Sequence, residues 1–203
     1  MAVPDNVFAT HPRVAYADIR PWIRSGDLLL AAGDLPFSRL IQHATESLWS
    51  HVAFVLRVEA GDRVMLLESV ESRGVRAVPL RSYLQDYNGT GRAYPGRLLL
   101  ARHAHFAAHA HRAALQNLAR FDVTRFGQPH DRATVARLAA RLAAGPLGAD
   151  RAPALVADED CLCAEYVDRC YQAVGLAIAP GWQGYVAPAD FAHDPAVNPL
   201  WVI

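Results

Sequence analysis

The sequence contains no lysine, and all 20 of its basic residues are arginine. A Walker phosphate loop, a Schiff-base enzyme, a protein kinase and a Ser-Lys hydrolase each need a lysine in a fixed role, so these classes are excluded. The 20 arginines are balanced by 20 acidic residues, which gives a formal net charge of zero. A neutral protein lacks the concentrated positive field that attracts nucleic acids and anionic membranes. We therefore expect no nucleic-acid partner.

Cysteine is scarce, and long apolar runs are missing. The three cysteines, Cys161, Cys163 and Cys170, lie within ten residues of one another, an arrangement poorly suited to a disulfide framework. No stretch reaches the roughly 18 apolar residues of a membrane span, and residues 1–20 lack the basic and apolar regions of a signal peptide. The sequence thus predicts a cytoplasmic protein in a reducing compartment, with no membrane span.

The pattern of apolar residues and turn formers predicts an α+β protein. There is no internal repeat and no long linker, so we expect a single domain over 1–203 with a helical excursion at about 104–150. The expected strands lie at 27–30, 50–58, 64–69, 75–78 and 97–102. The expected helices lie at 35–45, 80–87, 105–120, 131–144, 161–174 and 188–192.

Cys163 falls in the first turn of the predicted helix 161–174. Unpaired backbone N–H groups and the helix dipole favour a thiolate there, which is the form a nucleophilic cysteine needs. Cys163 also belongs to an apolar stripe with Tyr166, Val167 and Cys170, so packing in the core is an equally good interpretation. The acidic residues 158–160 disfavour a thiolate if they point at the sulfur.

A thiolate needs a base, and His51 opens a predicted strand where its ring can reach a neighbouring helix. A hairpin turn at 59–61 places residues 67–71 of the returning strand opposite His51. Glu68 and Glu71 lie in that segment, and Glu68 comes directly after the apolar run 65–67. A carboxylate beside His51 would orient the ring and favour its protonated form. A lone histidine with a structural role is the alternative.

These residues resemble a known family. Gly26-Asp27-Leu28-Leu29, Ser50-His51-Val52-Ala53, Leu67-Glu68-Ser69, Cys163-Ala164-Glu165 and Ala187-Pro188-Ala189-Asp190 are similar to the circularly permuted branch of NlpC-type papain-like hydrolases. YiiX-like proteins belong to that branch, and lecithin:retinol acyltransferase-like enzymes are related to it. The order is the most specific point, because His and acid precede Cys here.

The resemblance implies a permuted papain-like fold, in which an antiparallel sheet packs against a central helix that bears the cysteine. It implies a cysteine peptidase or amidase in which Cys163 is the nucleophile, His51 the base and Glu68 the orienting acid, with no cofactor. The substrate would be a small peptide, another compound containing an amino acid, or a lipid acyl compound. A lipid acyltransferase or thioesterase, and a non-catalytic module that binds peptide or lipid, are the alternatives. Ala164 and His130 depart from the family's usual serine and tyrosine.

Other clusters favour structural interpretations. His105 and His109 would share a helix face at a metal-ligand spacing, but a third ligand is not evident nearby. The three cysteines lack the paired Cys-x-x-Cys spacing of a zinc knuckle. Trp182 and Tyr185 in the Gly-rich tail are more typical of packing than of a substrate cleft. We therefore expect no metal.

Overall fold

Strand β1 lies in the middle of a six-stranded antiparallel sheet with the order β4-β3-β2-β1-β5-β6. We describe the fold from a computed structural model, in which all residues are described except 1, 71–72, 112–115, 117, 119–162 and 182–184. The strands are β1 (Asp27–Gly33), β2 (His51–Val58), β3 (Arg63–Val70), β4 (Gly74–Pro79), β5 (Gly96–His103) and β6 (Val197–Val202).

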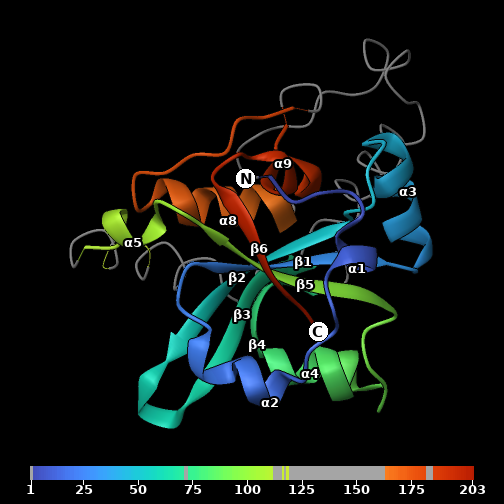
Figure 1. The fold of residues 1–203 in the computed structure, drawn as a ribbon, viewed down its shortest axis with the longest axis horizontal. Helices are drawn as coiled ribbons and strands as arrows, with labels where there is room; N and C mark the ends of the chain where they lie inside the picture. Colours follow the sequence, from blue (N-terminus) through green and yellow to red (C-terminus); the bar gives the residue numbers. More distant parts are fainter. Residues whose placement is uncertain (1, 71–72, 112–115, 117, 119–162, 182–184) are drawn as a thin grey trace.

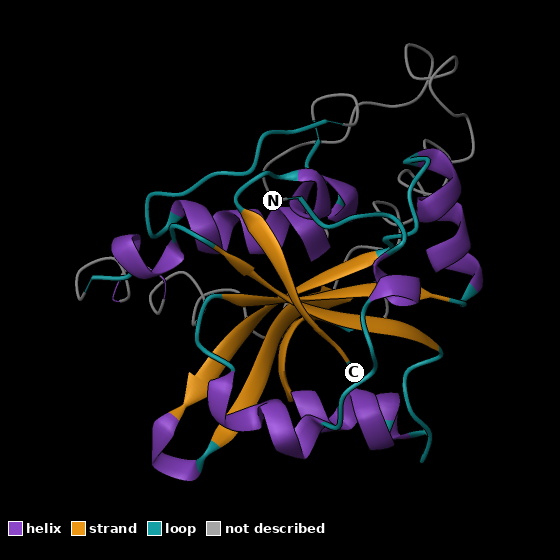
Figure 2. Cartoon of the chain, viewed as in Figure 1, coloured by secondary structure: helices purple, strands orange, loops and turns teal. Residues whose placement is uncertain are grey.

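Helices cover both faces of the sheet (Figures 1 and 2). One face carries α8 (Cys163–Gln172), α9 (Pro188–His193) and α5 (Phe106–His109), and the opposite face carries α2 (Tyr16–Ile19) and α4 (Leu80–Gln85). The remaining described elements are α1 (Val7–Thr10), η1 (Arg20–Trp22), α3 (Pro36–Ala44), η2 (Glu59–Gly61) and η3 (Tyr87–Gly89).

Side chains along the central strands point alternately to the two faces of the sheet, which divides the core into two layers. In β1, Leu28 and Leu30 belong to the cluster under α8, whereas Leu29 and Ala31 belong to the cluster under α4. Successive side chains of a strand point to opposite faces, and both faces are covered here, so every residue of β1 is buried. The run 28–30 therefore looks uniformly apolar in the sequence.

The structure shows a mixed α/β architecture, and each expected strand is found within three residues of its predicted ends. Strand β6 was not expected, because Pro199 and Asn198 break the tail's strand pattern. Proline is tolerated there since β6 is an edge strand, and its pairing with β5 shifts register next to Pro199.

Two predicted helices differ from the structure or lie outside it. The helix expected at 105–120 is interrupted after His109, because Ala110 leaves the helical conformation (φ −78°, ψ 48°), and residues 116 and 118 are helical again. Tertiary contacts override alanine propensity at this point: Phe106 is buried and packs against Phe54 and Tyr171. The helix expected at 131–144 lies outside the described residues, as does most of the predicted excursion. Among the described helices, none has the length and apolar character to cross a bilayer.

Gly26 is a position where only glycine fits. Its φ of +86° is left-handed, and an added Cβ would lie 2.1 Å from the Phe106 ring. We expect Gly26→Ala to lower the free energy of unfolding by roughly 2–5 kcal/mol, through backbone strain together with overpacking. Urea unfolding measures this. Gly91→Ala is the matched control, because φ is +69° but no atom lies within 4 Å of an added Cβ; it should cost only about 1–2 kcal/mol. Equal losses for the two variants would contradict the steric account.

Candidate active site

Helix α8 begins at Cys163 and lies against strands β2 and β3. Its apolar face is anchored by Tyr171, whose hydroxyl donates to the Gly26 carbonyl oxygen at 2.9 Å. Asp168 ties the helix to the chain that follows, because its Oδ1 accepts from the Ile178 backbone N–H at 2.9 Å. These contacts fix the helix axis, and Cys163 is held at its first turn, half-buried and with a free thiol.

His51 is the first residue of β2, so its ring lies at the end of a strand. Ser50 fixes this end, since its Oγ accepts from the Gly33 N–H at 2.9 Å and donates to the Ala31 carbonyl oxygen at 3.3 Å. From this position the imidazole interacts with Cys163 through a side-chain hydrogen bond and through charge. Its Nε2 is hydrogen-bonded to Glu68 Oε2 at 2.7 Å, so Nδ1 is the ring nitrogen that is available to the sulfur.

Glu68 is a fully buried carboxylate with three partners. Besides His51, Oε2 accepts a short hydrogen bond from the Tyr83 hydroxyl. Oε1 accepts from Arg76, with Nε at 2.8 Å and Nη2 at 2.7 Å. Burying a carboxylate is costly unless it is paired and hydrogen-bonded, and here both oxygens are satisfied.

Arg76 and Tyr83 come from the two elements that follow β3. The β3–β4 register pairs Arg76 directly with Glu68, and Arg76 Nη1 also donates to Asn88 Oδ1 at 2.7 Å. Tyr83 reaches Glu68 from α4 and stacks on Tyr94 with ring centroids 5.3 Å apart. The Glu68 carboxylate is therefore surrounded by groups from β2, β4 and α4.

Three ionisable groups of alternating charge, His51, Glu68 and Arg76, follow one another next to Cys163. Burial alone lowers the pKa of His51, but the Cys163 charge and hydrogen bond, followed by Glu68, raise it to about 10. Burial alone raises the pKa of Glu68, but His51, Arg76 and Tyr83 together hold it below its ordinary value. An imidazolium between two anionic groups is the arrangement expected for a thiolate–imidazolium pair.

A second buried hydroxyl, that of Tyr94, interacts with the charge of Cys163. The Tyr94 hydroxyl is hydrogen-bonded to the side chains of Ser38 and Ser50 and interacts electrostatically with Cys163; burial is the main cause that raises its pKa to about 12. An added Cβ at Gly33 would lie 2.3 Å from this hydroxyl, so the glycine makes room for it. Tyr94 therefore keeps its hydroxyl proton at neutral pH.

The structure brings together all three residues singled out from the sequence, Cys163, His51 and Glu68. The hairpin register predicts the contact between His51 and Glu68, and the structure contains it. Sequence reasoning missed Arg76, Tyr83 and Tyr94. Only Arg76 had a usable signal, because the β3–β4 register sets it opposite Glu68. Glu71 lies outside the described residues. The acidic residues 158–160 lie outside the described residues.

The histidines at the end of β5 do not form a metal centre. The ring of His103 is buried, and its Nδ1 accepts from the His105 backbone N–H at 3.2 Å. Throughout the part of the chain that is described, no three or more His, Cys, Asp or Glu side chains are grouped to hold a metal ion.

Comparison with solved structures identifies the fold. A crystal structure of the metalloprotein YiiX from Escherichia coli O157:H7 (DUF1105) is similar, with a TM-score of 0.58 and 18% sequence identity; the match covers 88% of this chain and 98% of that chain. The chain thus has a YiiX-like fold. No family model and no curated protein match the sequence.

Both Glu68 oxygens are engaged, and Arg76 is a permanently charged cation against one of them.

The raised pKa of His51 predicts a protonated ring throughout the neutral range. Nitrogen-15 NMR of labelled imidazoles should show His51 titrating near pH 10, and a His51→Gln spectrum assigns the signal. Cys163→Ser removes the ionisable thiol, so the pKa of His51 should fall. Cys170→Ser changes a buried thiol in the same helix and should leave the titration unchanged. A wild-type midpoint near 6.5 would contradict the charge alternation.

Glu68 should make the fold sensitive to acid. Its pKa is lowered in the folded state, so its stabilising contribution is complete above the ordinary value of 4.5 and is lost as the pH falls through the lower folded value. Below pH 4.5 the free energy of unfolding should fall more steeply in the wild type than in Glu68→Gln, by up to about 1.4 kcal/mol per pH unit. Urea unfolding between pH 6 and pH 2 measures the slopes. Glu59→Gln, which removes an exposed carboxyl, should keep the wild-type slope, and a parallel Glu68→Gln profile would refute the assignment.

Proposed function

We propose that this protein is a cysteine hydrolase that cleaves amide or related acyl bonds, with Cys163 as nucleophile, His51 as base and acid, and Glu68 as orienting group. The observation that carries the proposal is the contact chain from Cys163 through His51 to the buried Glu68. A nucleophile, a base within hydrogen-bond reach and a third group that orients the base form the general pattern of covalent catalysis.

In the first half-reaction the Cys163 thiolate attacks the carbonyl carbon, and a carbon–sulfur bond forms as the carbonyl π electrons move to oxygen. The tetrahedral intermediate collapses, the bond to the leaving amine breaks, and His51 gives its proton to the nitrogen. The oxyanion would be stabilised by backbone N–H groups at the start of α8.

In the second half-reaction water attacks the thioester. His51, now neutral, takes a proton from the water, and the carbon–sulfur bond breaks to release the carboxylic acid product. The thiolate and imidazolium are restored, so no cofactor is consumed. Glu68 keeps Nε2 occupied throughout, which turns Nδ1 toward the sulfur and stabilises each imidazolium that forms.

The YiiX-like fold supports a permuted papain-like arrangement, because the His and acid strands precede the Cys helix in the chain and pack against it. Peptides and compounds that contain amino acids are the substrate class we propose.

Acylation by p-nitrophenyl acetate tests the proposal. The wild type should release a burst of p-nitrophenol and carry an acetyl group on Cys163, detected by mass spectrometry of peptides. Cys163→Ala should lose both signals. His51→Ala and Glu68→Gln should slow acylation by roughly 100-fold or more, because general-base catalysis typically contributes 10²–10⁴-fold.

Cys170→Ala is the matched control, since it removes the buried thiol of the same helix and should keep the burst. Circular dichroism verifies that each variant is folded. A folded wild type in which Cys163 reacts with neither the ester nor iodoacetamide at pH 7 would eliminate the hydrolase and leave a binding module. A burst with an ester of a long-chain fatty acid but none with an amino-acid ester would shift the substrate class to lipids.

A further inference from the structure

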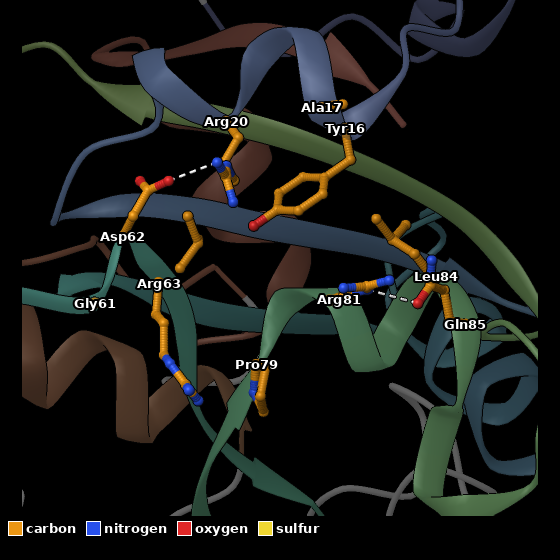
Figure 3. Close-up of a pocket in the computed structure, with 11 residues that line it drawn as sticks. Tyr16, Ala17, Arg20, Gly61, Asp62, Arg63, Pro79, Arg81, Leu84 and Gln85 are labelled. Atoms are coloured by element: carbon orange, nitrogen blue, oxygen red, sulfur yellow. Dashed lines mark hydrogen bonds and ion pairs between the residues drawn. The ribbon is translucent and has the colours of Figure 1, made fainter. Parts of the chain in front are cut away.

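Helix α4 has two faces with different surroundings. Arg81, Leu84 and Gln85 line a pocket of about 720 Å³ beside α2 and α4 (Figure 3). Leu80 and Tyr83 are instead buried, with 0% and 1% of their surface exposed. Residues three positions apart lie on the same side of a helix, so Leu80 and Tyr83 form the face of α4 that is turned toward the sheet.

Three contacts hold the Tyr83 ring in place. Its backbone carbonyl oxygen accepts from the Tyr94 N–H at 2.7 Å. The ring stacks on Tyr94 with centroids 5.3 Å apart and meets the edge of Tyr87 at 4.9 Å. The His51 ring lies nearly parallel to it, with 12° between the planes and 6.4 Å between the centroids. A ring packed in this way keeps its hydroxyl in one position, which is at Glu68 Oε2.

Tyr83 and His51 share one oxygen of the Glu68 carboxylate. Nε2 of His51 lies 2.7 Å from Oε2, and the Tyr83 hydroxyl donates a short hydrogen bond to the same oxygen. The other oxygen, Oε1, is held by Nε and Nη2 of Arg76. The carboxylate therefore cannot exchange its two oxygens without breaking a buried ion pair.

Two donors on one oxygen divide its negative charge between them. The positive end of the Tyr83 O–H dipole faces Oε2, close to the proton on Nε2, and so weakens the attraction between the carboxylate and the imidazolium. Although burial raises the pKa of Glu68, its contacts with His51, Arg76 and Tyr83 hold it below the ordinary value. Without the Tyr83 hydroxyl, two of these partners would still keep Glu68 ionised, and more of the charge of Oε2 would act on His51.

We propose that Tyr83 is a positioning residue that acts through Glu68, because its hydroxyl takes up part of the charge of Oε2 and thereby makes His51 a stronger acid. This role rests on the proposed function, in which His51 gives a proton to the leaving nitrogen as the carbon–nitrogen bond breaks and is itself left neutral. An imidazolium that Glu68 holds too strongly gives up that proton less readily. Tyr83 neither gains nor loses a proton in the step.

Nitrogen-15 NMR titration of His51 tests the proposal without any turnover. All variants carry Cys163→Ser, which removes the ionisable thiol and should lower the His51 midpoint from about 10. In this protein Tyr83→Phe should raise the midpoint by roughly half to one pH unit, about a three- to tenfold change in the acid constant, since one hydrogen bond to a charged group is large enough for this. Adding Tyr83→Phe to Glu68→Gln should cause no shift, because the hydroxyl acts through the carboxylate.

Tyr16→Phe is the control, because it removes a tyrosine hydroxyl on the same side of the sheet. Tyr16 lies in the pocket beside α2 (Figure 3), and none of its described charged neighbours belongs to the site, so the His51 midpoint should not move. Circular dichroism verifies that each variant is folded.

An unchanged or lower midpoint with Tyr83→Phe would overturn the proposal. The same rise in the Glu68→Gln protein, or with Tyr16→Phe, would overturn it as well, because the effect would then not pass through the carboxylate. A missing p-nitrophenol burst would refute the hydrolase without moving the midpoint, so the two failures are distinguishable.

Discussion

The burial of one negative charge shapes the site and the elements around it. Glu68 lies in an inner strand and is fully buried, so its desolvation must be offset by nearby cations and donors. Three elements provide them: β2 with His51, β4 with Arg76 and α4 with Tyr83. Moving any of these elements would remove a partner from the buried Glu68 carboxylate. The need to pair this carboxylate therefore fixes their relative positions.

This constraint explains why the proposed site is assembled from distant parts of the chain. His51 has partners in both helical layers, Cys163 in α8 and, through Glu68, Tyr83 in α4. The sheet fixes the position of α8 relative to His51. Strand β1 pairs with β2 and β5, and the Tyr171 hydroxyl of α8 donates to the Gly26 carbonyl oxygen just before β1. The thiol is therefore held by packing rather than by local loop geometry, which suits preorganised chemistry.

The strand pattern and the contact between His51 and Glu68 could be predicted from sequence, because a hairpin with a short turn sets its own register. Predicting the position of Arg76 required the register of a second strand pair, β3 with β4. Predicting the position of Tyr83 required the placement of α4 on the sheet, which depends on long-range packing. Strand β6 could not be predicted from a tail with Pro199 near its centre.

The alternating charges of His51, Glu68 and Arg76 restrict how such a protein can diverge. Replacing one of these residues leaves a buried charge without its partner, whereas replacing two neighbours of opposite sign leaves the net charge of the group unchanged. Evolutionary change at these positions should therefore proceed in coupled pairs. Among distant homologues, the identity of residue 76 should covary with that of residue 68 even where no chemistry remains.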